Sequence, residues 1–364
     1  MTGLLESEFG ALDVVLTDSG TSSLRLAIEG AARECPGALA LPAFCCYDVS
    51  TAAEGAGAPF VLYDIDPHTL GPDFDSLRAA VRAGASVIVV AHLYGIPVDL
   101  TTTLKIAGEE GALVIEDAAQ GAGARYSGRR LGSHGSVGVL SFARGKGITG
   151  VGGGALLATD ERGRAVVRSS DASDKSAPPG WRELARATAM WIMARPSTYG
   201  LAASLPHLHL GETVYREPTA PGPAPRTTLG ILRRTWPLGD SDTEVRRHNA
   251  AALLASIEQS APSLSTVVPP PDSYPSYLRL PLLASPAGYE AAATREARRL
   301  GIAPSYPRPL SRLESSGSLC VNRLADFPGA NKLARQLITL PTHSLLMARD
   351  MEALKGWTAS REAR

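Results

Sequence analysis

The chain has 364 residues, of which 44% are hydrophobic, so it is long enough to bury a substantial core and to form two closely packed domains. Its 36 basic residues balance its 36 acidic residues. This balance removes the electrostatic footprint expected of a nucleic-acid-binding protein, while small anionic ligands stay compatible with it. The N-terminus has no basic segment followed by an apolar core, so no secretory signal is predicted and a cytoplasmic location is expected.

The cysteines do not have the spacing of a metal site or a disulfide framework. Four thiols in so long a chain lack the pairing of a zinc site, so we expect no metal and reduced cysteines. Adjacent cysteines bridge poorly, and buried packing of Cys45 and Cys46 is favoured over redox activity. The four residues are Cys35, Cys45, Cys46 and Cys320.

Short apolar runs alternate with alanine-rich, helix-like stretches through the first half of the chain. This alternation predicts an α/β fold with a mostly parallel sheet. The runs that predict strands are Leu12–Leu16, Phe60–Tyr63, Ser86–Val90, Leu113–Ile115, Val137–Ser141 and Gly154–Leu157, and helices are predicted at Leu70–Arg82 and Thr102–Glu110.

A hydroxyl-rich stretch, Ser19-Gly20-Thr21-Ser22-Ser23, opens the first long helix. The first amides of a helix have no intrahelical partner and can bind an anion, so Thr21 and Ser22 are candidate phosphate donors. The alternative is a hydroxyl N-cap without any ligand, and this stretch alone favours that alternative.

Asp117 follows the apolar run Ala112–Ile115, which places its carboxylate at the carboxyl end of a buried strand. Open α/β sheets bind ligands at that edge, and a lone buried carboxylate needs a cationic partner. A protonated pyridine nitrogen is such a partner. The alternative is a carboxylate that caps a following helix, which is a common arrangement.

Lys146 lies in a glycine-flanked turn, before the glycine cluster Gly152–Gly154. A lysine amine in a partly dry pocket can form a Schiff base with a cofactor aldehyde, although most lysines are solvated surface groups. Together, Asp117 and Lys146 offer complementary groups for the pyridine nitrogen and the aldehyde of pyridoxal phosphate. The pair therefore predicts a pyridoxal phosphate site.

Prolines interrupt the chain from Ser170 to Pro225, which predicts a connecting region. Within it, the stretch Trp181–Leu210, which includes the apolar, proline-broken part from Met190 to Leu210, is split by Arg195-Pro196, and neither half is long enough to span a bilayer. A dimer interface or packing against the large domain is favoured over contact with a membrane surface or a carrier partner. The predicted domains are residues 1–215, with this segment from about residue 170, and residues 216–364.

The C-terminal part predicts a small α/β domain. A charged helical pattern begins at Thr243, and Tyr277–Leu282 followed by Tyr289–Leu300 indicates a strand and then a helix.

The motifs of the whole chain resemble the DegT/DnrJ/EryC1/StrS family of sugar aminotransferases, which have the pyridoxal phosphate-dependent fold type I. The resemblance is dense from about Asp18 to Thr159 and thin from Asp160 to about Glu244. The matching stretches are Ser19–Thr21, Pro42, Asp64, Asp66, His92–Gly95, Glu116–Gln120, Gly123-Ala124, Gly128, Gly132, Ser141-Phe142, Lys146, Gly152–Ala155, Tyr306–Leu310 and Leu340–His343.

The resemblance implies roles for several residues. Asp117 and Lys146 are the implied catalytic residues, Gln120 lies beside the phenolic oxygen of the cofactor, and its alternative role is to cap a helix after Asp117. Ser141 is the implied second hydroxyl on the phosphate side. The remaining implied cofactor residues are Gly20, Thr21, Ser22, Cys46 and Tyr47, and the implied substrate residues are Tyr94, Tyr306, Arg308 and His343.

The implied reaction is transamination. Lys146 would move a proton between the substrate carbon and C4′ of the cofactor, as base and then as acid. The implied donor is glutamate or glutamine, and the implied acceptor is a keto sugar or related keto compound, linked to a nucleotide. The implied assembly is a homodimer with shared active sites.

Several positions depart from the family pattern. Cys46 stands where many relatives have an aromatic residue that stacks on the cofactor, with Phe44 and Tyr47 close by, and Gly147, Gly152 and Ser311 also replace the usual residues. An atypical acceptor is therefore plausible. Two other functions stay open: a different pyridoxal phosphate enzyme, such as a lyase, decarboxylase or carbon-bond-forming synthase, and a non-catalytic homologue.

Overall fold

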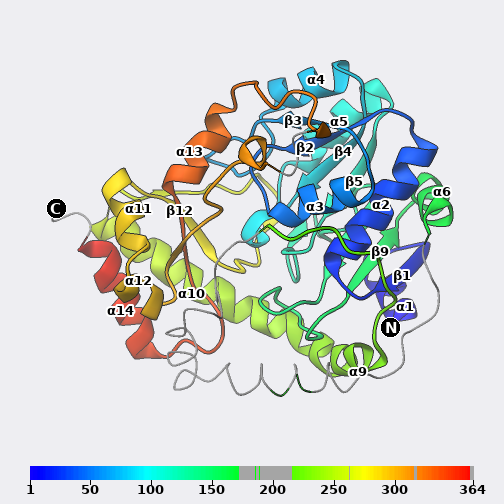
Figure 1. The fold of residues 1–364 in the computed structure, drawn as a ribbon. Helices are drawn as coiled ribbons and strands as arrows, with labels where there is room; N and C mark the ends of the chain where they lie inside the picture. The colour runs from blue at the N-terminus through cyan, green and yellow to red at the C-terminus, as the bar shows by residue number, and fades with distance from the viewer. Residues whose placement is uncertain (172–184, 186–187, 189–214, 262, 315–317, 361–364) are drawn as a thin grey trace.

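The computed structural model describes residues 1–171, 185, 188, 215–261, 263–314 and 318–360. Its centre is a seven-stranded sheet with the strand order β1-β9-β8-β5-β4-β2-β3 (Figure 1). Strands β2, β3, β4, β5 and β8 pair in parallel, whereas β9 is antiparallel to both of its neighbours. The predicted mostly parallel sheet is confirmed. The strands are β1 (Asp13–Thr17), β2 (Ala38–Pro42), β3 (Phe60–Tyr63), β4 (Ala85–Ala91), β5 (Leu113–Asp117), β8 (Val137–Ser141) and β9 (Gly154–Ala158).

Helices cover this sheet, and small residues decide how closely they pack. A Cβ at Gly30 would lie 2.1 Å from the carbonyl oxygen of Val166, so glycine allows α2 and α6 to touch. The predicted helix at Leu70–Arg82 is wrong at its start. Leu70 has a φ of 58°, and the carboxylate of Asp73 accepts from Ser76 N, which starts the helix at Phe74. The helices are α1 (Thr2–Phe9), α2 (Gly20–Glu34), α3 (Tyr47–Gly55), α4 (Phe74–Arg82), α5 (Leu100–Glu110) and α6 (Glu161–Ser169).

The C-terminal part forms a second, four-stranded sheet with the order β10-β12-β14-β13, packed with α10 and α14 around its own hydrophobic cluster (Figure 1). The predicted helix at Tyr289–Leu300 is two helices, because the hydroxyl of Thr294 accepts from Ala297 N and starts a new one. The elements are α9 (Arg226–Thr235), α10 (Gly239–Ser260), β10 (Ser265–Thr266), β12 (Leu280–Leu283), α11 (Pro286–Ala292), α12 (Arg295–Arg299), β13 (Ala303–Pro304), β14 (Leu337–Leu340) and α14 (Ala348–Ala359).

Two boundaries in this part differ from the predictions. Helix α10 begins at Gly239, four residues before the charged pattern, because the short turn Trp236–Leu238 leads directly into it. Strand β12 begins at Leu280, and Tyr277 has a φ of 44°, which is not a strand conformation.

Segments of the C-terminal half dock onto the large sheet. The carboxylate of Asp64 accepts from Gly329 N at 2.7 Å and Ala330 N at 2.8 Å, and so caps α13 (Pro328–Gln336). The side-chain amide of Asn322 bonds both the N–H and the carbonyl of Leu62, which extends the hydrogen bonding beyond the edge strand β3. These contacts hold the two halves of the chain together.

Some predictions concern residues outside the described ranges. The Met190–Leu210 stretch lies there, so its role stays a prediction, as does the division at residue 215. Within the described residues, no helix is long and apolar enough to cross a membrane.

Candidate active site

The parallel strands bring several predicted side chains to one edge of the sheet. Ala91 at the end of β4 pairs in register with Asp117 at the end of β5, and Asp117 pairs with Val139 in β8, which ends at Ser141. Carboxyl ends of parallel strands form the ligand-binding edge of an open α/β sheet. The topology therefore gathers Asp117, Ser141 and the loop that carries Lys146 in one place.

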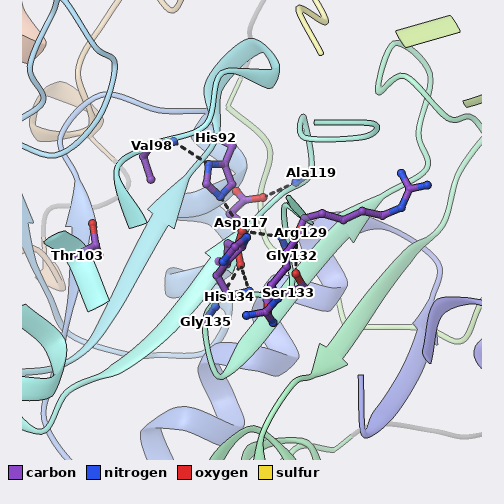
Figure 2. Close-up of polar contacts among 12 residues, drawn as sticks. His92, Val98, Thr103, Asp117, Ala119, Arg129, Gly132, Ser133, His134 and Gly135 are labelled. Atoms are coloured by element: carbon purple, nitrogen blue, oxygen red, sulfur yellow. Dashed lines mark hydrogen bonds and ion pairs between the residues drawn. The ribbon is translucent and has the colours of Figure 1, made fainter. Parts of the chain in front are cut away.

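Asp117 is a half-buried acid with a free acceptor. Its Oδ1 accepts a hydrogen bond from Ala119 N at 3.0 Å (Figure 2). Its other oxygen has no partner among the described residues. Burial raises the pKa of Asp117, while the backbone bond and the charge of Lys146 lower it. Turns and the short strand β6 (Arg125–Tyr126) follow, so the alternative of a helix cap is wrong.

Lys146 lies in the loop between β8 and β9. The flanking Gly145 and Gly147 have φ values of 75° and 81°, a left-handed conformation that glycine adopts without strain. The positive charge of Lys146 lowers the pKa of both Asp117 and Cys46, so its amine lies within electrostatic range of both groups. Within the described part of the chain, that amine has no hydrogen bond or ion pair.

The N-terminus of α2 meets the end of β8. A Cβ at Gly20 would lie 2.6 Å from the Cβ of Ser141, so only glycine permits this approach. The hydroxyl of Ser19 accepts from Ser22 N at 3.1 Å and contacts the Ser22 hydroxyl at 2.8 Å, which confirms the predicted helix start. The Ser141 hydroxyl has no hydrogen-bond partner in the described residues. Helix amides, Thr21 and Ser141 thus form a candidate anion site.

Aromatic rings cluster around Tyr306, which lies within electrostatic range of Cys46. The ring of Tyr306 lies 5.5 Å from Phe44, 6.1 Å from Tyr47 and 6.2 Å from Tyr94, with the last pair stacked. Burial raises the pKa of the Cys46 thiol to about 12, and the charge of Lys146 opposes this only in part. Cys46 is therefore a neutral thiol at physiological pH.

Gln120 bridges two of these tyrosines. Its Oε1 accepts from Tyr94 N at 2.9 Å, and its Nε2 donates to the Tyr306 hydroxyl at 2.9 Å. Tyr94 has a φ of 57°, which the bond from its N–H to Gln120 supports, and its hydroxyl contacts the hydroxyl of Ser305. The alternative helix-capping role of Gln120 is wrong, because turns follow Asp117. The contribution of Ser305 was not predicted, since no local pattern marks a lone serine.

The predicted substrate residues divide into two groups. One group contains Tyr94, Tyr306 and the backbone of Arg308, and Tyr47 links them. The Tyr47 ring lies beside Tyr306, and its hydroxyl accepts from Arg308 N at 3.1 Å and lies 3.2 Å from the Arg308 carbonyl. The Arg308 side chain is exposed. His343 belongs elsewhere. Its backbone contacts Asn249 of α10, and burial followed by the charges of Arg246 and Arg279 lowers its pKa.

Beside Asp117, Glu116 forms a closed polar cluster that the sequence analysis did not foresee. Glu116 is fully buried and accepts from Gly132 N at 2.6 Å, His134 N at 2.8 Å and Gly135 N at 3.2 Å. Its carboxylate also lies 3.0 Å from His92 Nε2. Figure 2 shows His92 and the 132–135 loop converging on this strand. A local signal existed, because adjacent residues of a strand point to opposite faces.

The charge states within this cluster follow from its hydrogen bonds. His92 Nδ1 accepts from Val98 N at 3.2 Å, so the ring proton lies on Nε2 and is donated to Glu116. Burial acts to raise the pKa of Glu116, but the bonds from His92 and Gly132 outweigh it, and the pKa is about 2. Glu116 is an anion held entirely by the protein.

The large, mostly parallel sheet flanked by helices, with the smaller C-terminal sheet beside it, has the fold type I architecture that the sequence predicted. Residues 5–176 match the sequence model of the DegT/DnrJ/EryC1/StrS aminotransferase family. This agrees with the predicted resemblance.

Named relatives and solved structures are similar to parts or to the whole of this chain. The chain is 37% identical over 146 residues to an L-glutamine:2-deoxy-scyllo-inosose aminotransferase of Streptomyces kanamyceticus, covering 40% of this chain and 34% of that protein. It is 33% identical over 151 residues to a 3-amino-5-hydroxybenzoate synthase of Amycolatopsis mediterranei, covering 42% and 39%. These matches span little more than a third of each relative. The fold matches S. venezuelae DesV, solved with a ketimine intermediate, at a TM-score of 0.78 and 21% identity, covering 100% of this chain and 88% of DesV.

Proposed function

We propose that this protein is a pyridoxal phosphate-dependent aminotransferase that moves an amino group from glutamine or glutamate to a keto sugar or related keto compound, in the biosynthesis of a polysaccharide or secondary metabolite. The observation that carries the proposal is the placement of Lys146 within electrostatic range of Asp117, at the edge where Ser141 meets the N-terminus of α2. The name of the Streptomyces relative favours glutamine as the donor.

The free polar groups of this edge fit the cofactor. The unpaired oxygen of Asp117 is an acceptor for a protonated ring nitrogen, and the amine of Lys146 is free to engage an aldehyde. The N-terminus of α2, with Thr21 and Ser141, offers donors for a phosphate, whereas the Ser22 hydroxyl, the other predicted donor, contacts the Ser19 hydroxyl at 2.8 Å. When bound, the cofactor supplies an electron sink for the substrate carbon.

Lys146 Nζ is the group that moves protons. With the cofactor bound, Lys146 Nζ would take the proton from the amino-bearing carbon of the donor and would return a proton at C4′ of the cofactor. Asp117 keeps the ring nitrogen protonated through a charge-assisted hydrogen bond, and its burial strengthens that bond. The rings of Tyr94 and Tyr306, which are both buried, exclude water from this side of the site.

The test is an absorbance titration of the purified, cofactor-loaded chain with L-glutamine, L-glutamate and other amino acids. The true donor should convert the cofactor to its aminated form, and an added keto sugar should reverse the change. Lys146→Ala serves as the control that cannot turn over. Release of carbon dioxide or of a cleaved product, without formation of the aminated cofactor, would favour a lyase or decarboxylase instead.

We also propose a cytoplasmic homodimer, with nucleotide-linked keto sugars as the first acceptors to test. Sedimentation at micromolar concentration should show twice the 38.1 kDa mass of the chain. An active monomer would contradict the dimer and any sharing of sites between subunits.

A further inference from the structure

A second cavity lies between the middle of α10 and the segment 269–277. Its volume is about 390 Å³. Arg247, Ala251 and Leu254 line it from α10, and their spacing of four and three residues puts them on one face of the helix. The opposite wall includes Pro269, Pro270 and Pro275. The cavity thus has one cationic group and a mostly apolar wall.

Arg247 is held in place but not neutralised. Its Nη1 donates to the carbonyl of Pro275 at 2.9 Å, and its guanidinium lies 3.7 Å from the centre of the Tyr274 ring. Neither Nε nor Nη2 has an acceptor among the described residues, and no described carboxylate lies within 4.0 Å of the guanidinium. Nε and Nη2 form the fork that binds a carboxylate with two parallel hydrogen bonds. Because the side chain is already fixed, that fork is preorganised.

Ser273 supplies a second unused donor. It also lines the cavity, and its buried hydroxyl has no hydrogen-bond partner within the described part of the chain. Its backbone pairs with Tyr126 in the small sheet of β6 and β11 (Ser273–Tyr274), which fixes its position. An unpaired buried hydroxyl destabilises a protein, so a ligand that accepts from it gains that interaction.

The segment 272–277, which carries Ser273, is fixed by hydrogen bonds to residues that do not line the cavity. Asp272 and Tyr277, at either end of this short segment, have φ values of 60° and 44°. Such conformations persist only where surrounding contacts enforce them. Ser127 N donates to the Asp272 carbonyl at 2.9 Å, and Ser276 N donates to the Gly95 carbonyl at 2.9 Å. The cavity is therefore preformed.

We propose that this cavity binds a small monocarboxylate with an apolar or ring-shaped body. The Arg247 fork and the Ser273 hydroxyl bind the carboxylate, while the prolines, Leu254 and the Tyr277 ring pack against the body. The exposed carboxylate of Asp272 at the rim disfavours a dianion, which selects against phosphate esters. This site is independent of the function proposed for Lys146.

Benzoate is the probe, measured by calorimetric titration of the full chain with pyridoxal phosphate present, so that the proposed phosphate site is filled. We expect one saturable site. Arg247→Met should weaken binding at least tenfold, and Arg247→Lys should weaken it less, because the charge stays while the fork is lost. Arg299→Met, which removes an exposed arginine of α12 outside the cavity, should leave it unchanged.

Ser273→Ala keeps the proposal testable if Arg247→Met fails to fold. It removes one unpaired hydroxyl and should weaken benzoate binding several-fold without lowering the melting temperature. The absence of saturable binding, or equal binding by wild type and Arg247→Met, would overturn the proposal. Tighter binding of inorganic phosphate than of benzoate would overturn the assignment to carboxylates.

Discussion

Glu116 and Asp117 are neighbours on β5, yet their surroundings are opposite. Glu116 is fully buried, and three backbone amides and His92 surround its two oxygens. Asp117 is half-buried, and only one of its oxygens accepts a hydrogen bond from a described residue. An acid that the protein satisfies completely stabilises the fold, whereas an acid left with a free acceptor is available to a ligand.

The pKa shifts of the two acids express the same contrast. The hydrogen bonds of Glu116 outweigh its burial and lower its pKa to about 2. Burial raises the pKa of Asp117, because one backbone bond and the charge of Lys146 do not compensate for it fully. A cationic ligand group beside Asp117 would remove that cost. The predictions that follow test this division between structure and function.

The largest effect is expected at Lys146, the cation within range of Asp117. Lys146→Ala should lower turnover by about 10⁴-fold, because it removes the group proposed to move protons. Borohydride reduction of the loaded enzyme, followed by peptide mass mapping, should place the cofactor on Lys146. Lys105→Ala, at an exposed position of α5, is the control. Labelling of Lys175 or Lys332 would disprove the assignment.

Asp117→Asn should lower turnover by about 10² to 10³-fold while the melting temperature stays close to that of the wild type. The amide preserves the shape and the bond from Ala119 N, but it cannot hold the ring nitrogen protonated. Single-turnover kinetics should show that proton transfer is the slowed step. Normal turnover in this variant would mean that Asp117 has only a structural role, as the acceptor of the hydrogen bond from Ala119 N in the turn.

Glu116→Gln is the matched substitution on the neighbouring residue, and it should act on stability. The folded pKa of about 2 lies below the ordinary value of 4.5, so the charge of Glu116 stabilises the fold by about 3 kcal/mol above pH 4.5. That contribution is lost as the pH falls toward 2. Urea unfolding at pH 7 should show the variant less stable by this amount, with the difference narrowing in acid. Equal stability of the wild type and Glu116→Gln at pH 7 would contradict the structural role assigned to Glu116.

The smallest effect is expected at Ser141. Ser141→Ala should weaken the affinity for pyridoxal phosphate by about tenfold, since one hydrogen bond to a charged group is lost. Equilibrium dialysis measures this without reference to activity. Ser86→Ala, at the amino end of β4, removes a hydroxyl that donates to the Cys35 carbonyl and is the control. If both variants bind the cofactor equally well, Ser141 has no phosphate role.

The sequence by itself determined the start of α2 and the strands of the large sheet other than β2, and it predicted the acid–lysine pair. These features are local: apolar runs define buried strands, Ser19 caps the next residues of the chain, and Asp117 is the last residue of its strand. Prediction from the sequence failed at helix boundaries that fall inside a stretch with helical periodicity. The predicted helices at Leu70–Arg82 and Tyr289–Leu300 were altered by caps at Asp73 and Thr294, whose effect competes with helical periodicity over only a few residues.

Only the tertiary structure decided which groups complete the sites. Gln120 meets Tyr306, Glu116 meets Gly132, and Gly20 meets Ser141, although each pair is separated in the chain. The physical reason is that polar groups bury themselves only with partners, and packing brings those partners from elsewhere in the chain. The sequence therefore showed that Asp117 and Glu116 are both acidic, whereas the fold decided that one is satisfied and the other is free.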